Sequence, residues 1–208
     1  MLTDNNMMVM FFKSQTMLVL IACSVVVVTF ALERWIYFLR TRYSAREFKS
    51  PMRKQLSRNQ LSEFSRYCEQ GSGSLGRIMA AAVENLSAGR EQVDLILDTE
   101  IEKEQIKLEK NLVILGTLAN IAPLLGLFGT VVGIIRAFRD IAVTGSGGSS
   151  VIAMGVSEAL LTTAAGIVIA VIATVCYNYF TRTIRVRATD AEDARNDFWK
   201  YVNSRPVQ

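Results

Sequence analysis

The chain has 208 residues, of which 50% are hydrophobic, with a net charge of +4 and no histidine. Its apolar residues come in long blocks, which excludes an ordinary soluble domain and predicts an all-α integral membrane protein. Without histidine or paired cysteines the chain offers no nucleophile, base or metal cluster, so neither an enzyme nor a bound cofactor is expected.

The first apolar block covers residues 17–32, and aromatic and aliphatic side chains at 35–39 extend it into an interfacial belt. We therefore predict an outer N-terminal segment and a first transmembrane helix over residues 1–39. The block lacks a small-x-small cleavage site, so we expect an uncleaved anchor. Cys23 sits in a stretch that looks like a lipoprotein processing site, but the apolar run continues after it, which favours an unmodified cysteine.

The polar region that follows is predicted to be mostly helical. Pro51 is expected to break the chain after the first span, and the glycines at 71–76 to form a flexible turn. From Glu91 onward apolar residues recur at three- and four-residue spacing, which predicts an amphipathic helix. Without a Gly or Pro to interrupt it, this helix is expected to run into the second span as one rod, with Glu104 on its solvent-exposed face.

The second span carries a flat, small-residue surface. Gly126, Gly129 and Gly133 lie within about 60° of one another on a helix, so another backbone can approach closely. Pro123 removes one backbone hydrogen bond and is predicted to kink this helix. Thr130 adds a hydroxyl inside the apolar run.

The third span carries a matching stripe of small and polar residues that includes Glu158, Thr162 and Gly166, with Thr163 beside it. An intramembrane carboxylate costs several kcal/mol unless it is protonated, hydrated or paired, so a functional role is expected for Glu158. Thr162 follows one turn along the same face, which suggests that both look into a shared polar interior. With Thr130, these residues predict a membrane hairpin that lines a water-containing space.

Basic residues follow the first and third spans and are scarce ahead of the first. Because such residues stay on the cytoplasmic side, the N-terminus is predicted outside and the C-terminus in the cytoplasm. Anionic headgroups attract basic residues at span ends, so the positive charge requires no nucleic acid as partner. The remaining predicted segments are a cytoplasmic helical region (40–111), a second transmembrane helix (112–138), a short outer loop (139–150), a third transmembrane helix (151–180) and a cytoplasmic C-terminal helix (181–208).

Two motifs in the long spans are specific. They are IAPLLGLFGTVVGII at 121–135 and GVSEALLTTAAG at 155–166, followed by the pair Tyr177 and Asn178. Together they resemble the MotA/TolQ/ExbB proton-channel family, nearest its ExbB/TolQ branch. The chain departs from the family pattern at Ile172, where many relatives have proline.

The resemblance implies a role for individual residues. The family's pore threonines correspond to Thr130 and Thr163, its intramembrane glutamate to Glu158, and Pro123 also matches. Thr162 is often alanine in the family, and its extra hydroxyl leaves sodium open as the coupling ion beside the proton.

The resemblance also implies an assembly in the bacterial inner membrane. Five copies form a ring in which the second and third spans line a central pore and the first span faces lipid. A partner of the ExbD/TolR type sends one helix with an intramembrane aspartate through that pore, and a TonB- or Tol-like protein is a further candidate partner. The present chain has no intramembrane Asp, so the partner must supply the titrating group.

A different function stays open at this point. A non-conducting membrane scaffold that assembles around a partner helix explains the glycines equally well, although it explains Glu158 and the threonines less well. The envelope process that is energised is also open.

Overall fold

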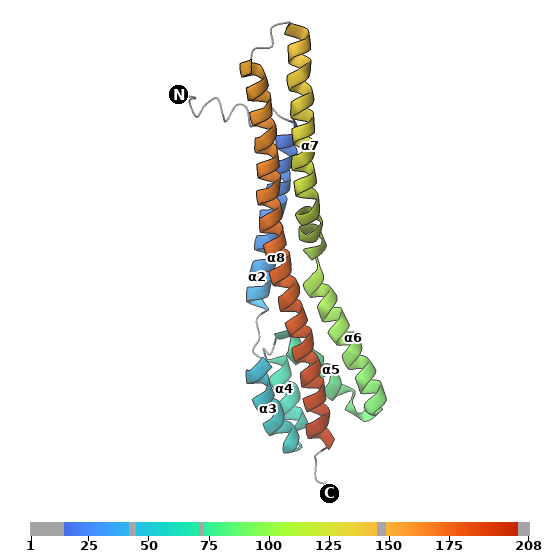
Figure 1. The fold of residues 1–208 in the computed structure, drawn as a ribbon. Coiled ribbons are helices and arrows are strands. Elements are labelled where there is room, and N and C mark those ends of the chain that lie inside the picture. Colours follow the sequence, from blue (N-terminus) through green and yellow to red (C-terminus); the bar gives the residue numbers. More distant parts are fainter. Residues whose placement is uncertain (1–14, 42–44, 71–72, 145–148, 204–208) are drawn as a thin grey trace. The chain divides into compact units, whose positions relative to one another are not determined.

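The computed structural model describes residues 15–41, 45–70, 73–144 and 149–203, and every regular element in these ranges is helical (Figure 1). This confirms the all-α prediction for the described part of the chain. The helices are α2 (Gln15–Arg40), α3 (Ala45–Ser57), α4 (Leu61–Glu69), α5 (Gly73–Glu84), α6 (Arg90–Glu109), α7 (Leu112–Thr144) and α8 (Ser149–Asn203), with a short 3-10 turn, η1 (Leu86–Ala88).

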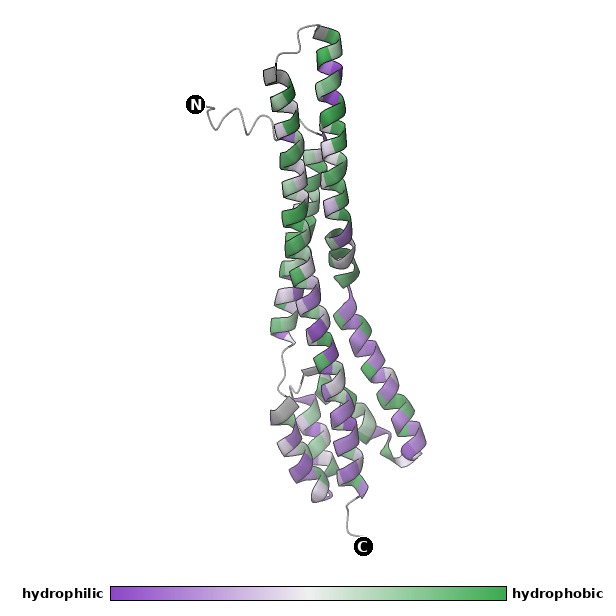
Figure 2. Ribbon diagram, in the orientation of Figure 1, coloured by the Kyte–Doolittle hydropathy of each residue, from purple (hydrophilic) through white to green (hydrophobic). Residues whose placement is uncertain are grey.

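Three helices in the described ranges are long and apolar enough to cross a membrane. They are α2, residues Leu112–Val143 of α7 and a stretch of α8 that begins at Ile152. Figure 2 shows the apolar colouring along these helices and its change to hydrophilic colouring on α6 and on the C-terminal part of α8. The three predicted spans are confirmed by length and composition. Helix α7 continues past the predicted boundary at 138, and α8 is one helix of 55 residues.

The chain divides into two compact units. The apolar unit contains α2 up to Arg34, α7, and α8 up to Tyr179. The polar unit contains the end of α2 from Trp35, helices α3 to α6, and α8 from Phe180.

The polar unit has its own hydrophobic core. Side chains from α3, α4, α5, α6 and α8 bury one another, and full burial of each large apolar side chain stabilises the fold by about 1.5–3 kcal/mol. Residues with almost no exposed surface are Met52, Leu56, Phe64, Met79, Leu97 and Phe198.

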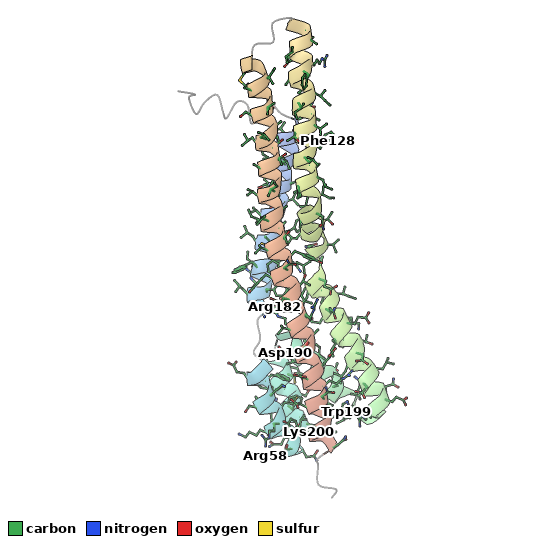
Figure 3. All side chains as sticks on the ribbon, in the orientation of Figure 1. Arg58, Phe128, Arg182, Asp190, Trp199 and Lys200 are labelled. Carbon is green, nitrogen blue, oxygen red and sulfur yellow. The ribbon has the colours of Figure 1, made fainter. Side chains whose placement is uncertain are left out.

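Specific polar contacts join the elements of this unit. The indole of Trp199, labelled in Figure 3, donates to the Asp94 carboxylate over 2.6 Å. Arg187 of α8 donates to the Phe38 carbonyl over 3.1 Å and to the Thr41 hydroxyl over 3.0 Å. These last two bonds fasten the end of α2 to α8.

The predicted chain break at Pro51 is wrong, because Pro51 lies inside α3. An internal proline costs about 3 kcal/mol through its lost hydrogen bond and ring clash. The same helix buries Phe48, Met52 and Leu56 at four-residue spacing, and their combined burial outweighs that cost. Of the predicted turn at 71–76, residues 71 and 72 lie outside the described residues, and the rest begins α5.

The predicted uninterrupted rod from α6 into the second span is also wrong. Helix α6 ends at Glu109, Lys110 is extended with φ −50° and ψ 133°, and Asn111 has a left-handed φ of 68° before α7 begins. Asn reaches this conformation more easily than other non-glycine residues because its short polar side chain bonds locally. A break can therefore occur without Gly or Pro.

Glu104 does not lie on the solvent-exposed face of α6, so its predicted position is wrong as well. Its side chain is 9% exposed, and its Oε2 accepts a hydrogen bond from Arg77 over 3.1 Å. The buried face of α6 carries Val93, Leu97 and Leu108, and Glu104 falls on the same face at helical spacing. Arg77 makes this burial possible by pairing with the carboxylate.

Candidate functional site

Helices α7 and α8 approach each other through small residues. A methyl group added at Gly133 would lie 2.8 Å from the Ala159 Cβ, and one added at Gly166 would lie 2.6 Å from the Ala122 carbonyl oxygen. Real Cβ atoms do not come this close to other atoms. The two backbones are therefore nearly in contact, and the glycines are required for it.

The other predicted packing residues belong to the same contact. Gly126 and Gly129 face α8 at Thr162 and Thr163. Pro123 lies inside the continuous helix α7 and next to Ala122, which is fully buried. This close packing sets the positions of the hydroxyls around it.

Thr130 and Thr163 donate their hydroxyl protons to neighbouring carbonyl groups of α7. Thr163 donates across the helix pair to the Gly126 carbonyl over 3.0 Å, and Thr130 donates within α7 to the Leu127 carbonyl over 2.6 Å. Both side chains are half-buried. Because each hydroxyl uses its proton internally, its oxygen lone pairs remain available to accept a hydrogen bond or to coordinate a cation.

Thr162 lies inside the helix pair. Its side chain is 2% exposed, and its hydroxyl donates to the Ala159 carbonyl over 2.7 Å. It fills the space opposite Gly129, which has no side chain of its own. Thr162 and Thr163, although adjacent in sequence, therefore have different surroundings.

Glu158 and Thr163 flank opposite sides of the surface that α8 presents to α7. At 100° per residue, Thr163 and Glu158 each lie about 70° from the middle of the contact surface formed by Ala159, Thr162 and Gly166, on opposite sides. Glu158 is half-buried and forms no hydrogen bond or ion pair with the residues that the structure describes. One chain therefore does not bring Glu158 together with the two half-buried threonines.

Helix α2 lies against the side of α7 that is opposite Thr130. The Thr16 hydroxyl would be 3.4 Å from a methyl group at Gly129, and a pocket of about 260 Å³ opens between α2 and α7. Phe128, labelled in Figure 3, lines this pocket and points about 160° away from Thr130 on the helix wheel. We call the side with Thr130 and Thr163 the threonine edge and the side with the pocket the α2 edge.

The α2 edge was missed from the sequence. Its α7 wall is formed by Leu125, Phe128, Val132 and Arg136, which recur at three- and four-residue spacing. That spacing is visible in the sequence, but it reads as an ordinary lipid-facing stripe that ends in a basic residue. Only the position of α2 shows that the stripe lines a pocket.

Comparison with known proteins gives the same family as the two motifs. Residues 70–193 match the model of the MotA/TolQ/ExbB proton channel family. The biopolymer transport protein ExbB of Aquifex aeolicus is 34% identical over 126 residues, which cover 58% of this chain and 85% of that protein.

Two further relatives match shorter shares of their own length. The ExbB of Pseudomonas putida is 46% identical over 81 residues, 39% of this chain and 25% of that protein. The Tol-Pal system protein TolQ of Pseudomonas aeruginosa is 34% identical over 128 residues, 62% of this chain and 51% of that protein. The family model covers the α7–α8 pair with its threonines and glycines, and the relatives carry the ExbB and TolQ names, so the chain belongs to the MotA/TolQ/ExbB proton channel family, in its ExbB/TolQ branch.

Proposed function

We propose that this chain is the ring-forming subunit of an ion-motive-force-driven complex in the bacterial inner membrane. It conducts protons at the interface with an ExbD/TolR-like partner helix and so energises work at the envelope or outer membrane. The observation that carries this proposal is the threonine edge, where two hydroxyls donate to the neighbouring Gly126 and Leu127 carbonyls on the side of α7 away from α2. Family membership and the three apolar helices support it.

The chemistry of the threonine edge suits an ion that another protein carries. Thr130 and Thr163 offer oxygen lone pairs but hold their protons in fixed bonds to backbone carbonyls, so they are acceptors and not titrating groups. In the proposed pentamer, with its N-termini outside and C-termini in the cytoplasm, these acceptors surround the partner's aspartate. Each elementary charge that crosses 100 mV releases about 2.3 kcal/mol, which is available to move the partner helix.

Glu158 and Thr162 have separate places in the proposed pathway. Glu158 lies nine residues from the start of α8, about 14 Å along the axis, on the edge away from Thr163, so any part it has in the pathway requires a neighbouring copy in the ring. Thr162 packs against Gly129 between α7 and α8, and this contact fixes the position of the neighbouring Thr163 hydroxyl. The proton is the proposed ion, and flux that requires sodium would contradict this choice.

A non-conducting scaffold is the second candidate, and the glycine contacts bear on it. Gly126, Gly133 and Gly166 are used for packing between α7 and α8 of the same chain. They are therefore explained without a partner helix, and they no longer favour a scaffold that closes around one. The threonine edge has no role in such a scaffold.

Ion flux through the reconstituted complex separates the two candidates. The complex of this chain with the protein encoded by a neighbouring ExbD/TolR-like gene is placed in liposomes, and flux is followed with a pH-sensitive dye under an imposed potential. Thr163→Val removes the hydroxyl and keeps the shape, whereas Thr163→Ser keeps the hydroxyl. Thr117→Val is the matched control, because Thr117 also donates to a carbonyl of α7, that of Val113, over 2.7 Å but on another face.

The ion-path proposal predicts that Thr163→Val abolishes flux while the partner still co-purifies. Thr163→Ser and Thr117→Val should conduct like the wild type. Normal flux through the Thr163→Val complex would leave the scaffold as the better account.

A further inference from the structure

The pocket on the α2 edge has a polar end and an apolar floor. Its polar lining residues are Gln15 and Thr16 at the start of α2 and Arg136 of α7, and its apolar ones are Val19, Leu125, Phe128 and Val132. Helices α2 and α7 run in opposite directions (Figure 1), and the start of α2 lies beside the middle of α7, because Thr16 is next to Gly129. Arg136 lies about 10 Å further along α7. The pocket is therefore a groove along the helices with one charged end.

The α7 wall of the groove has the length of one leaflet of a bilayer. Leu125 and Arg136 are eleven residues apart, which is about 16 Å along a helix. The hydrocarbon core of a bilayer is about 30 Å thick, so this length is close to half of it. Arg136 then lies at the level of the headgroups and Leu125 near the middle of the membrane.

Arg136 is suited to a phosphate. Its side chain is exposed and forms no ion pair with any residue that the structure describes. A guanidinium is always charged and binds phosphate through two parallel hydrogen bonds. Gln15 and Thr16 add polar atoms to the lining of the groove beside the middle of α7.

We propose that this groove binds one membrane phospholipid, with its phosphate on Arg136 and an acyl chain along Val132, Phe128 and Leu125. The charge of Arg136 complements a phosphate, and the apolar α7 wall has the length of one leaflet, so both favour a phospholipid over a protein segment. A helix or strand would not need a single cation at the end of an apolar surface. The lipid lies on the opposite side of α7 from Thr130. It fills the space between α2 and α7 and fixes the first span against the second without touching the threonine edge.

Lipid retention by the full-length chain tests the proposal. The protein is purified in a mild detergent, incubated with dioleoylphosphatidylglycerol and analysed by native mass spectrometry. Arg136→Gln removes the charge at the headgroup level, and Val132→Trp fills the groove while keeping Arg136. The matched controls are Arg139→Gln, which removes a charge one turn further out, and Val131→Trp, which places the same ring about 100° away on the helix.

The proposal predicts one phospholipid per chain in the wild type and in both controls. Arg136→Gln should weaken retention at least about tenfold, because the amide of Gln cannot replace the two charge-assisted hydrogen bonds to phosphate, and Val132→Trp should abolish it. Equal retention by Val132→Trp and the wild type would overturn the proposal, as would equal retention by Arg136→Gln and the wild type.

A second copy of the chain is the rival occupant of the groove. A cysteine introduced at Val19 that cross-links to another copy in place of retaining lipid would also overturn the proposal. Lipid retention is measured without ion flux, so its failure and the failure of the ion pathway are separate results.

Discussion

Replacing Gly166 with alanine tests the close contact between α7 and α8. The new methyl group would lie 2.6 Å from the Ala122 carbonyl oxygen and 3.0 Å from the Gly126 Cα, both backbone atoms. Since ordinary contact begins at 3.4 Å, the helices must move apart by about 0.8 Å. Gly133→Ala makes a different contact, because its methyl group would meet the Ala159 side chain at 2.8 Å.

The expected cost follows from this geometry. Overpacking of a close contact costs about 1–3 kcal/mol, and alanine returns up to about 1 kcal/mol through its better helix propensity. We therefore expect Gly166→Ala to lower the free energy of unfolding by about 1–2 kcal/mol. Ala159→Gly should restore the stability of Gly133→Ala, whereas Ala122→Gly should not restore Gly166→Ala, because the clash there is with the backbone.

Reversible unfolding in mixed micelles, followed by far-UV circular dichroism, measures these differences as a double-mutant cycle. The cycle of Gly133 and Ala159 should give a coupling energy that the cycle of Gly166 and Ala122 lacks. Wild-type stability of Gly166→Ala, or equal rescue in both cycles, would refute the contact geometry.

Three predictions concern the polar unit. Arg77→Ala leaves the buried Glu104 carboxylate without its observed partner and should lower the free energy of unfolding by about 1–3 kcal/mol, as measured by chemical denaturation. Adding Glu104→Leu should recover most of this loss, and no recovery would contradict the pairing. Burial, with a smaller contribution from Glu69, raises the pKa of the Cys68 thiol to about 12. An alkylating reagent at pH 8 should therefore leave Cys68 unmodified until the protein unfolds, as mass spectrometry can show. Rapid alkylation of Cys68 in the native protein would contradict its burial. Burial, followed by the nearby Asp193 charge, raises the pKa of Asp190 above its usual 3.8, although Lys49 opposes this. The folded state therefore holds this proton more tightly than the unfolded state, and the free energy of unfolding falls as the pH rises from 3.8 through the higher pKa of the folded state. Asp190→Asn should remove this pH dependence, and an unchanged pH profile of stability would count against it.

The spans could be predicted from the sequence because they are long apolar runs, and such runs need no knowledge of neighbouring elements. The end of α6 could not, since Asn111 carries no signal as strong as Gly or Pro and only its left-handed backbone shows the break. Pro51 was misread for a related reason. The burial of Met52 and its neighbours decides that α3 continues, and that burial depends on helices that are distant in sequence.

The candidate site was predictable by residue type but not by orientation. Thr162 and Thr163 are adjacent hydroxyls, and the sequence does not say which of them α8 turns toward α7. The glycines of α7 decide it, because Gly129 leaves room for Thr162 and the Gly126 carbonyl accepts the bond from Thr163. Glu158 was grouped with Thr162 by spacing alone, whereas the packing places it on the edge away from Thr163.

Disulfide cross-linking to the partner helix tests most directly whether the threonine edge faces that helix. Single cysteines at Thr130, Thr163 and, as the control on the α2 edge, Phe128 are introduced into a chain whose three native cysteines are serine, and each is paired with cysteines along the partner's span. The account predicts cross-links from positions 130 and 163 near the partner's aspartate and none from position 128. Cross-links from position 128, with none from the two threonine positions, would contradict it.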